Sequence, residues 1–207
     1  MRIDPTGMND HDYKKSKETG RLTIVPGSVD NPEYDRIIDD QGNTLKVDKG
    51  VIRNENMGIK TSGINIHTNE KIAVTYDFYQ FNDKDKAFEF YEFMSNPDTN
   101  WVEFSFSDKT NSSGQNYFTV GTIGQQYSEA TWGIIFDQEY TKDSNIKLNE
   151  MRHWHPINAG ASYEDIRAKE YFSKKYPNQN TKFIIDCKEC EYDKKSNKVV
   201  PRSITEY

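Results

Sequence analysis

Apolar residues occupy every second position in one stretch of the chain, and this alternation predicts a β-strand over residues 71–81. Ile72, Val74, Tyr76 and Phe78 hold the alternate positions, so a strand would present all four on one face. Shorter runs of the same kind predict strands over residues 101–107, 117–123, 130–136, 146–154 and 181–186, with the weakest alternation in 146–154. A last hairpin is expected through residues 194–197 into a strand over 198–200.

Two stretches have the spacing of amphipathic helices instead. The first runs from a cap at Asp83 or Asp85 to Ser95, and Pro97 prevents its continuation. Its apolar face is broad and contains Ala87, Phe88, Phe90, Tyr91, Phe93 and Met94. The second covers residues 163–176. One helix before the run of strands and one after it predict an α+β fold, with a central mixed sheet flanked by two main helices.

Aromatic residues divide the chain into two parts. Of its 27 aromatic residues, only Tyr13 and Tyr34 fall within residues 1–69. Because aromatic side chains supply much of the area that a core buries, the main core is expected in residues 70–207. The first part is rich in turn-forming Pro and Gly pairs. It is therefore expected to be a leader or linker with short strands such as residues 44–47.

Composition excludes several classes of protein. Among 207 residues, 34% are hydrophobic and 29% are charged, yet the aromatic content is too high for a disordered chain. No apolar run approaches the ~20 residues of a membrane span, and no basic stretch followed by an apolar core begins the chain, so neither a membrane span nor a signal peptide is expected. The net charge is −6, and residues 70–207 carry 17 Lys and Arg against 22 Asp and Glu. This balance argues against nucleic acid as a partner.

Candidate chemistry concentrates between residues 153 and 165. The chain has four histidines, and two of them, His153 and His155, lie two residues apart, so on a strand both imidazoles would project from one face toward one metal ion. Ser162 and Asp165 have the spacing of a helix-capping pair, which would place Asp165 in the first helical turn. Two neutral histidines and a carboxylate leave a fourth position open, as in a catalytic zinc site. Taken separately, the His pair also fits an exposed strand face, and the Ser-Asp pair a simple helix cap.

The order His-x-His-Pro followed by Ser-x-x-Asp resembles the signature of the JAB/JAMM (MPN+) zinc metalloprotease family. The resemblance implies that His153, His155 and Asp165 bind one Zn²⁺ and that the Ser162 hydroxyl stabilises the oxyanion formed during hydrolysis. Two departures are visible. Trp154 stands between the histidines, where the family usually has Ser or Thr, and the interval from the second histidine to the aspartate is one residue shorter than usual.

The family also has an upstream glutamate that activates water, and Glu103 fits this role. It follows the first predicted helix and precedes His153 by 50 residues. Strand alternation would place Glu103 on the face opposite Val102, Phe104 and Phe106. An edge-strand glutamate facing solvent is the alternative. Two rivals are less suitable, because Glu150 lies on the histidine strand itself and Glu129 lies in an expected loop.

A second resemblance covers the start of the chain. Asp4-Pro5-Thr6-Gly7-Met8 is similar to the tract that closes the RHS-repeat core of large secreted bacterial proteins. In those proteins variable toxin domains follow the tract, and JAB-like domains are among them. The resemblance implies a domain delivered from a bacterium as part of a larger protein, acting in a target cell and matched by a cognate immunity protein. Residues 1–69 would then be the core end and linker, and residues 70–207 the toxin domain.

The sequence therefore predicts a zinc-dependent peptidase or isopeptidase that acts on a protein or peptide substrate, such as a ubiquitin-like tail. Two alternatives stay open: a metal-dependent nuclease toxin, and a catalytically silent JAB-like module that binds protein. Cys187 and Cys190 are the two cysteines of the chain. Because no second Cys-x-x-Cys pair exists, they are expected to form a turn, with a local disulfide if the domain is secreted.

Overall fold

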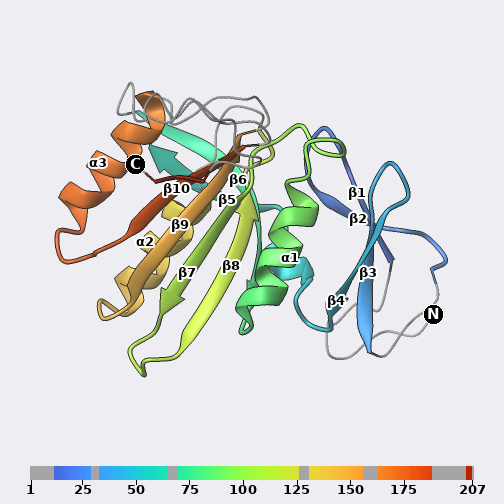
Figure 1. Ribbon diagram of the computed structural model, residues 1–207, viewed down its shortest axis with the longest axis horizontal. Coiled ribbons are helices and arrows are strands. Elements are labelled where there is room, and N and C mark those ends of the chain that lie inside the picture. The colour runs from blue at the N-terminus through green and yellow to red at the C-terminus, as the bar shows by residue number, and fades with distance from the viewer. Residues whose placement is uncertain are drawn as a thin grey trace.

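The computed structural model describes residues 12–28, 33–64, 70–125, 131–155, 163–187 and 204–206. These residues form two β-sheets, three α-helices and one short 3₁₀ helix (Figure 1). The elements are β1 (Asp12–Lys15), β2 (Leu22–Ile24), β3 (Tyr34–Ile38), β4 (Thr44–Asp48), η1 (Asn54–Asn56), β5 (Ile59–Ile64), β6 (Lys71–Phe81), α1 (Lys84–Met94), β7 (Ser105–Thr110), β8 (Asn116–Thr122), α2 (Thr131–Lys142), β9 (Lys147–His155), α3 (Tyr163–Lys175), β10 (Lys182–Cys187) and β11 (Ile204–Glu206).

A seven-stranded mixed sheet forms the centre of the molecule. Its strands lie in the order β11-β10-β9-β7-β8-β6-β5. The β9–β10 pair is parallel and the other neighbouring pairs are antiparallel. Helix α1 covers one face, whereas α2 and α3 lie against the other (Figure 1). The predicted α+β fold with a central mixed sheet is confirmed.

The strand and helix with the clearest sequence patterns occur where they are expected. Strand β6 spans residues 71–81, as predicted. The N-cap of α1 is Asp83, whose side chain accepts a hydrogen bond from the Lys86 backbone N–H at 3.0 Å. The buried face of α1 consists of Ala87, Phe90, Tyr91 and Met94, and Phe88 and Phe93 pack at its margins.

One strand prediction was wrong. Residues 130–136 were expected to form a strand, but from Thr131 they begin helix α2. Trp132, Ile135 and Phe136 are buried, and their three- and four-residue spacing is that of one helical face. Phe136 and Trp132 contact Phe172 of α3 with ring centroids 5.3 and 5.5 Å apart. The sheet is therefore flanked by three helices rather than two.

A second strand begins later than predicted. Residues 101–107 were expected to form it, but β7 begins at Ser105 and continues to Thr110. The Asn100 side chain is the physical reason, because it accepts a hydrogen bond from the Val102 N–H at 3.3 Å and donates to the Val102 carbonyl. These are the groups that a neighbouring strand would otherwise pair with. The hairpin expected through residues 194–200 lies outside the described residues.

The part of residues 1–69 that the structure describes is ordered into strands. Strands β2, β1, β3 and β4 form a separate four-stranded sheet beside α1 (Figure 1), and β4 contains the strand expected at residues 44–47. Tyr13, Ile37 and Leu45 of this sheet belong to the same buried cluster as α1 and Phe106. Strand β5 pairs with β6. The division of the chain into residues 1–69 and 70–207 stays a prediction.

Lys15 ties the N-terminal sheet to the end of α1. Its side chain is only 1% exposed, and its Nζ donates to the carbonyl oxygens of Phe93 and Met94 at 3.0 and 3.3 Å and to Thr99 Oγ1 at 2.9 Å. The carbonyls at the C-terminus of a helix need such external donors. Burial lowers the pKa of Lys15 to about 8, although Asp39 and Asp40 oppose this effect.

Replacement of Lys15 by methionine should destabilise the fold. Lys15→Met keeps the aliphatic stem but leaves three acceptors without their donor, two of them in buried hydrogen bonds, at an expected cost of ~2–3 kcal/mol in the free energy of unfolding. Lys14 is exposed on the same strand, and Lys14→Met should cost less than ~0.5 kcal/mol. Urea unfolding of both variants measures the difference, and equal stabilities would contradict the assigned role.

The same pair of proteins, wild type and Lys15→Met, gives a pH test. The pKa of Lys15 is about 8 in the fold, against 10.5 for an ordinary lysine. At a solution pH between these values, the Lys15 amine therefore takes up a proton when the protein unfolds. The stability of the wild type relative to Lys15→Met should therefore rise from pH 8 toward pH 10, by at most ~1.4 kcal/mol per pH unit. A difference that falls over this range would have the wrong sign.

Candidate metal centre

Strand β9 presents both histidines of the predicted site on one face of the sheet. His153 lies opposite Ser105 of β7 and beside Ile185 of β10. His153 and His155 are buried, with 4% and 7% of their surfaces exposed, and their Nε2 atoms lie 2.8 Å apart. Both rings therefore point to one place, as the two-residue spacing predicts.

Asp165 reaches the same place from the first turn of α3. Its Oδ1 lies 3.0 Å from His153 Nε2 and its Oδ2 lies 3.4 Å from His155 Nε2. The N-terminal end of a helix favours a negatively charged side chain. The shorter interval between His155 and Asp165 therefore does not prevent the three side chains from meeting.

Glu103 is the fourth member of the cluster and enters from the segment before β7. It is 7% exposed, and its Oε1 lies 4.0 Å from His155 Nε2. The backbone is fixed at this point, because the Glu103 N–H donates to the Gln125 carbonyl at 2.9 Å and its own carbonyl accepts from Thr122 Oγ1 at 2.7 Å. As predicted, Val102, Phe104 and Phe106 pack into the opposite, apolar side of the sheet.

The other residues considered from the sequence either point away from the site or lie outside the described residues. Glu150 pairs with Arg152 at 2.5 Å, and β9 turns both of these residues away from the histidines. Trp154 lies in the apolar cluster with α1, so the large residue between the histidines does not enter the site. Ser162 and Glu129 lie outside the described residues. Thr122 supports the Glu103 backbone, and no motif in the sequence pointed to it.

The donor set suits a metal ion. One donor atom each from Glu103, His153 and His155 lies within 4.8 Å of the others, and Asp165 adds a carboxylate closer to both imidazoles than Glu103 is. Burial lowers the pKa of His153, although Asp165 opposes the effect. The neutral imidazole that results is the form that binds metal. Two imidazoles and carboxylates are typical zinc ligands, so this group can hold a metal ion.

A family comparison agrees with this geometry. Residues 79–195, more than half of the chain, match the model of the family described as JAB-like toxin 1. The chain belongs to the JAB-like toxin 1 family. The matched range contains Glu103, both histidines and Asp165. No curated protein and no solved structure gives a significant match.

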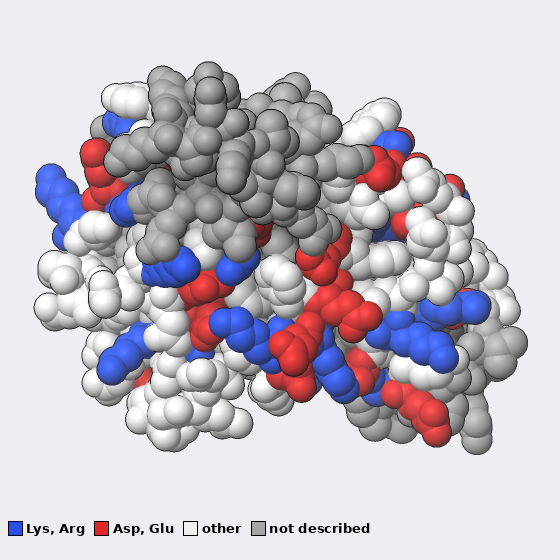
Figure 2. All heavy atoms as spheres, viewed as in Figure 1, with Lys and Arg blue, Asp and Glu red and all other residues white. Residues whose placement is uncertain are grey.

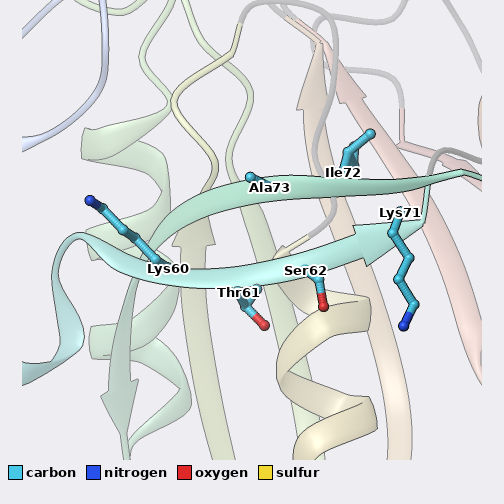
Figure 3. Close-up of a pocket in the computed structure, with 6 residues that line it drawn as sticks. All are labelled: Lys60, Thr61, Ser62, Lys71, Ile72 and Ala73. Carbon is cyan, nitrogen blue, oxygen red and sulfur yellow. The ribbon is translucent and has the colours of Figure 1, made fainter.

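A hollow elsewhere on the surface of this JAB-like toxin carries no comparable chemistry. This hollow, on the β5–β6 hairpin, contains none of the site residues, and its two lysines point in different directions (Figure 3). It is lined by Lys60, Thr61, Ser62, Lys71, Ile72 and Ala73. Among the helices that the structure describes, none is long and apolar enough to cross a membrane.

Metal content gives a direct test of the cluster. The purified toxin should bind close to one zinc ion per chain, and His155→Ala should abolish binding because it removes one of three close donors. His67→Ala is the matched histidine control and should retain the metal. Elemental analysis after chelation and reloading measures all three proteins. A well-folded wild type that takes up no zinc would contradict the assignment.

Proposed function

We propose that this JAB-like toxin is a zinc-dependent peptidase or isopeptidase, and that it is the C-terminal effector domain of a bacterial RHS-family toxin. The observation that carries the proposal is the buried convergence of His153 and His155 on the two oxygens of Asp165, at 3.0 and 3.4 Å. Glu103 lies nearby but farther from His155, at 4.0 Å. The three close side chains are suited to bind the metal ion, and the more distant carboxylate is suited to act as a base.

His153, His155 and Asp165 would hold the zinc. When bound, zinc supplies a Lewis acid that polarises the substrate carbonyl and lowers the pKa of a bound water to about 7. The protein contributes a buried site, since both histidines and Glu103 are less than 10% exposed. Electrostatic interactions are stronger in such surroundings than in water.

Glu103 would act as the general base and then as the general acid. Its carboxylate accepts a proton from the attacking water while the water oxygen bonds to the carbonyl carbon of the substrate. The same proton then passes to the amide nitrogen as the C–N bond breaks, which releases an amine and a carboxylic acid, and the acid loses its remaining proton to solvent. A base can perform this transfer from hydrogen-bond distance or through one water, and the Glu103 position beside His155 supports the role.

Ser162 would donate a hydrogen bond to the oxyanion that develops on the substrate carbonyl. This role comes from the family resemblance and from its place three residues before Asp165. The substrate class, a protein or peptide tail such as that of a ubiquitin-like protein, rests on the same resemblance. Delivery into a target cell and a cognate immunity protein are part of the proposal for the same reason.

The charge distribution favours a protein substrate over a nucleic acid. On the face shown in Figure 2, the lysine and arginine side chains of the described residues are interspersed with acidic ones and form no continuous basic stripe. Residues 70–207 carry five more acidic than basic side chains, from 17 Lys and Arg against 22 Asp and Glu. Clustered basic residues bind nucleic acid by neutralising its phosphates and releasing the counterions around them. The nuclease alternative therefore has less support than the peptidase.

Replacement of the proposed base should separate metal binding from hydrolysis. Glu103→Gln keeps the shape of the side chain but cannot accept the proton, so zinc content should stay near the wild-type value while kcat falls at least ~10²–10⁴-fold. Hydrolysis is measured on a fluorogenic peptide library and on ubiquitin-like fusion proteins with the zinc-loaded enzyme. Glu150→Gln, on the opposite side of the sheet, is the control. Hydrolysis retained by Glu103→Gln would remove Glu103 from the mechanism.

Loss of the Ser162 hydroxyl should slow the reaction and spare the metal. Ser162→Ala should lower kcat by ~10²–10³-fold, the usual effect of removing one oxyanion donor. Ser162→Thr retains a hydroxyl and should recover part of the rate. Unchanged kcat in Ser162→Ala would show that other groups stabilise the oxyanion.

A further inference from the structure

The segment that carries Glu103 lies outside the regular ladder of the sheet. Strand β7 begins at Ser105, and the backbone of Glu103, two residues earlier, is held by the Gln125 carbonyl and the Thr122 hydroxyl. We propose that the turn between β1 and β2, residues 16–21, is a positioning element of the site: it supports the segment 101–104 and thereby keeps Glu103 in place for proton transfer. The catalytic part of this inference rests on the proposed function.

Lys17 contacts the segment through both its backbone and its side chain. The Trp101 N–H donates to the Lys17 carbonyl at 2.9 Å. Lys17 Nζ donates to the Asp98 carbonyl at 3.0 Å and lies 5.3 Å from the centre of the Trp101 ring. These contacts fix the chain two residues before Glu103.

Gly20 packs directly beneath the next residues of the segment. The turn closes with hydrogen bonds from Gly20 N–H to the Ser16 carbonyl at 2.8 Å and from Ser16 N–H to the Arg21 carbonyl at 2.9 Å. Gly20 has φ +65°, and a Cβ there would lie 2.7 Å from the Phe104 ring and 2.8 Å from Val102 Cγ2. Both constraints require glycine. Phe104 is fully buried, so it has little room to move aside.

The turn also lies close to Thr122, whose hydroxyl binds the Glu103 carbonyl. A Cβ on Gly124 would lie 3.1 Å from the Thr19 carbonyl oxygen, so the turn lies close against the end of β8. Gly124 N–H donates to Thr122 Oγ1 at 2.9 Å, and that hydroxyl donates to the Glu103 carbonyl. Residues 16–21 therefore support both the segment that contains Glu103 and the residues that hold its backbone.

The metal ligands depend on different elements. His153 and His155 lie on β9 and Asp165 on α3, and none of the contacts above involves them. One hydrogen bond joins the segment to the histidine strand, from the Trp154 N–H to the Phe104 carbonyl at 2.9 Å, and residues 101–103 lie before it. Displacement of residues 101–103 should therefore move Glu103 relative to the metal ligands, and an unchanged zinc affinity checks that the ligands stay in place. A misplacement of about 1 Å can cost ~10²-fold in rate.

The test compares Gly20→Ala with Gly27→Ala in the full chain. Both glycines have positive φ, at +65° and +75°, but nothing lies within 4 Å of a Cβ on Gly27, so the control carries the backbone strain without the contact on Phe104. Gly20→Ala should speed hydrogen exchange at the Trp101 and Glu103 amides and lower kcat of the zinc-loaded protein by ~10–100-fold. Zinc affinity and KM should match the control.

Two further variants separate the positioning role from misfolding or a general loss of stability in Gly20→Ala. Lys17→Ala adds no volume, and relative to the exposed Lys14→Ala it should speed exchange at the same two amides. In a Glu103→Gln background Gly20→Ala should lower kcat no further, because both changes act on one group.

The experiments give different results if the turn has no positioning role and if the protein is not a peptidase. If the wild type hydrolyses peptides while Gly20→Ala and Lys17→Ala match their controls in exchange and in kcat, the positioning role is overturned and the enzyme assignment stands. If the wild type hydrolyses nothing, the enzyme assignment fails. The exchange measurements then decide alone whether the turn supports the segment: faster exchange at Trp101 and Glu103 upholds it, and unchanged exchange overturns it.

Discussion

The pairing register between β7 and β9 is the constraint on which the site depends. Ser105 lies opposite His153, and the Trp154 N–H donates to the Phe104 carbonyl at 2.9 Å, which continues the alignment as far as Glu103 and His155. A shift of one residue would turn every side chain of β9 to the other face. A bulge sets this register: Asp108 pairs with Glu150 and Lys109 with Leu148, so Asn149 is an extra residue, and its side chain donates to Asp108 and Thr110.

The two faces of the sheet have different tasks. On the side of α1, aromatic packing joins the central sheet to the N-terminal sheet through one buried cluster, and Lys15 bridges the two parts by hydrogen bonds to the end of α1. On the other side, α2 and α3 pack through Trp132, Phe136 and Phe172. This second core holds α3 against the sheet, so that Asp165 meets the histidines. The polar cluster is therefore fixed from several elements that are distant in sequence.

The sequence predicted correctly those features that depend on interactions between neighbouring residues. The alternation of β6, the cap of α1 at Asp83 and the shared face of His153 and His155 each depend on a few neighbouring residues, and each appears as expected. Helix α2 was predicted as a strand because a short apolar run with Trp and Ile fits a buried strand as well as a buried helix. The weak alternation of β9 has its cause in the extra residue Asn149. The support of Glu103 by Thr122 and by the turn at residues 16–21 depends on long-range packing, which no spacing in the sequence reveals.

In the proposed site His153, His155 and Asp165 hold one zinc ion, and Glu103 stays outside the ligand set. X-ray absorption spectroscopy at the zinc edge, on the zinc-loaded wild type and on Glu103→Gln, distinguishes ligands from the base. We expect a first shell of two imidazole nitrogens and light oxygen donors at ~2.0–2.2 Å, identical in both proteins. A first shell that loses a carboxylate oxygen in Glu103→Gln, or that contains fewer than two imidazoles, would contradict this assignment.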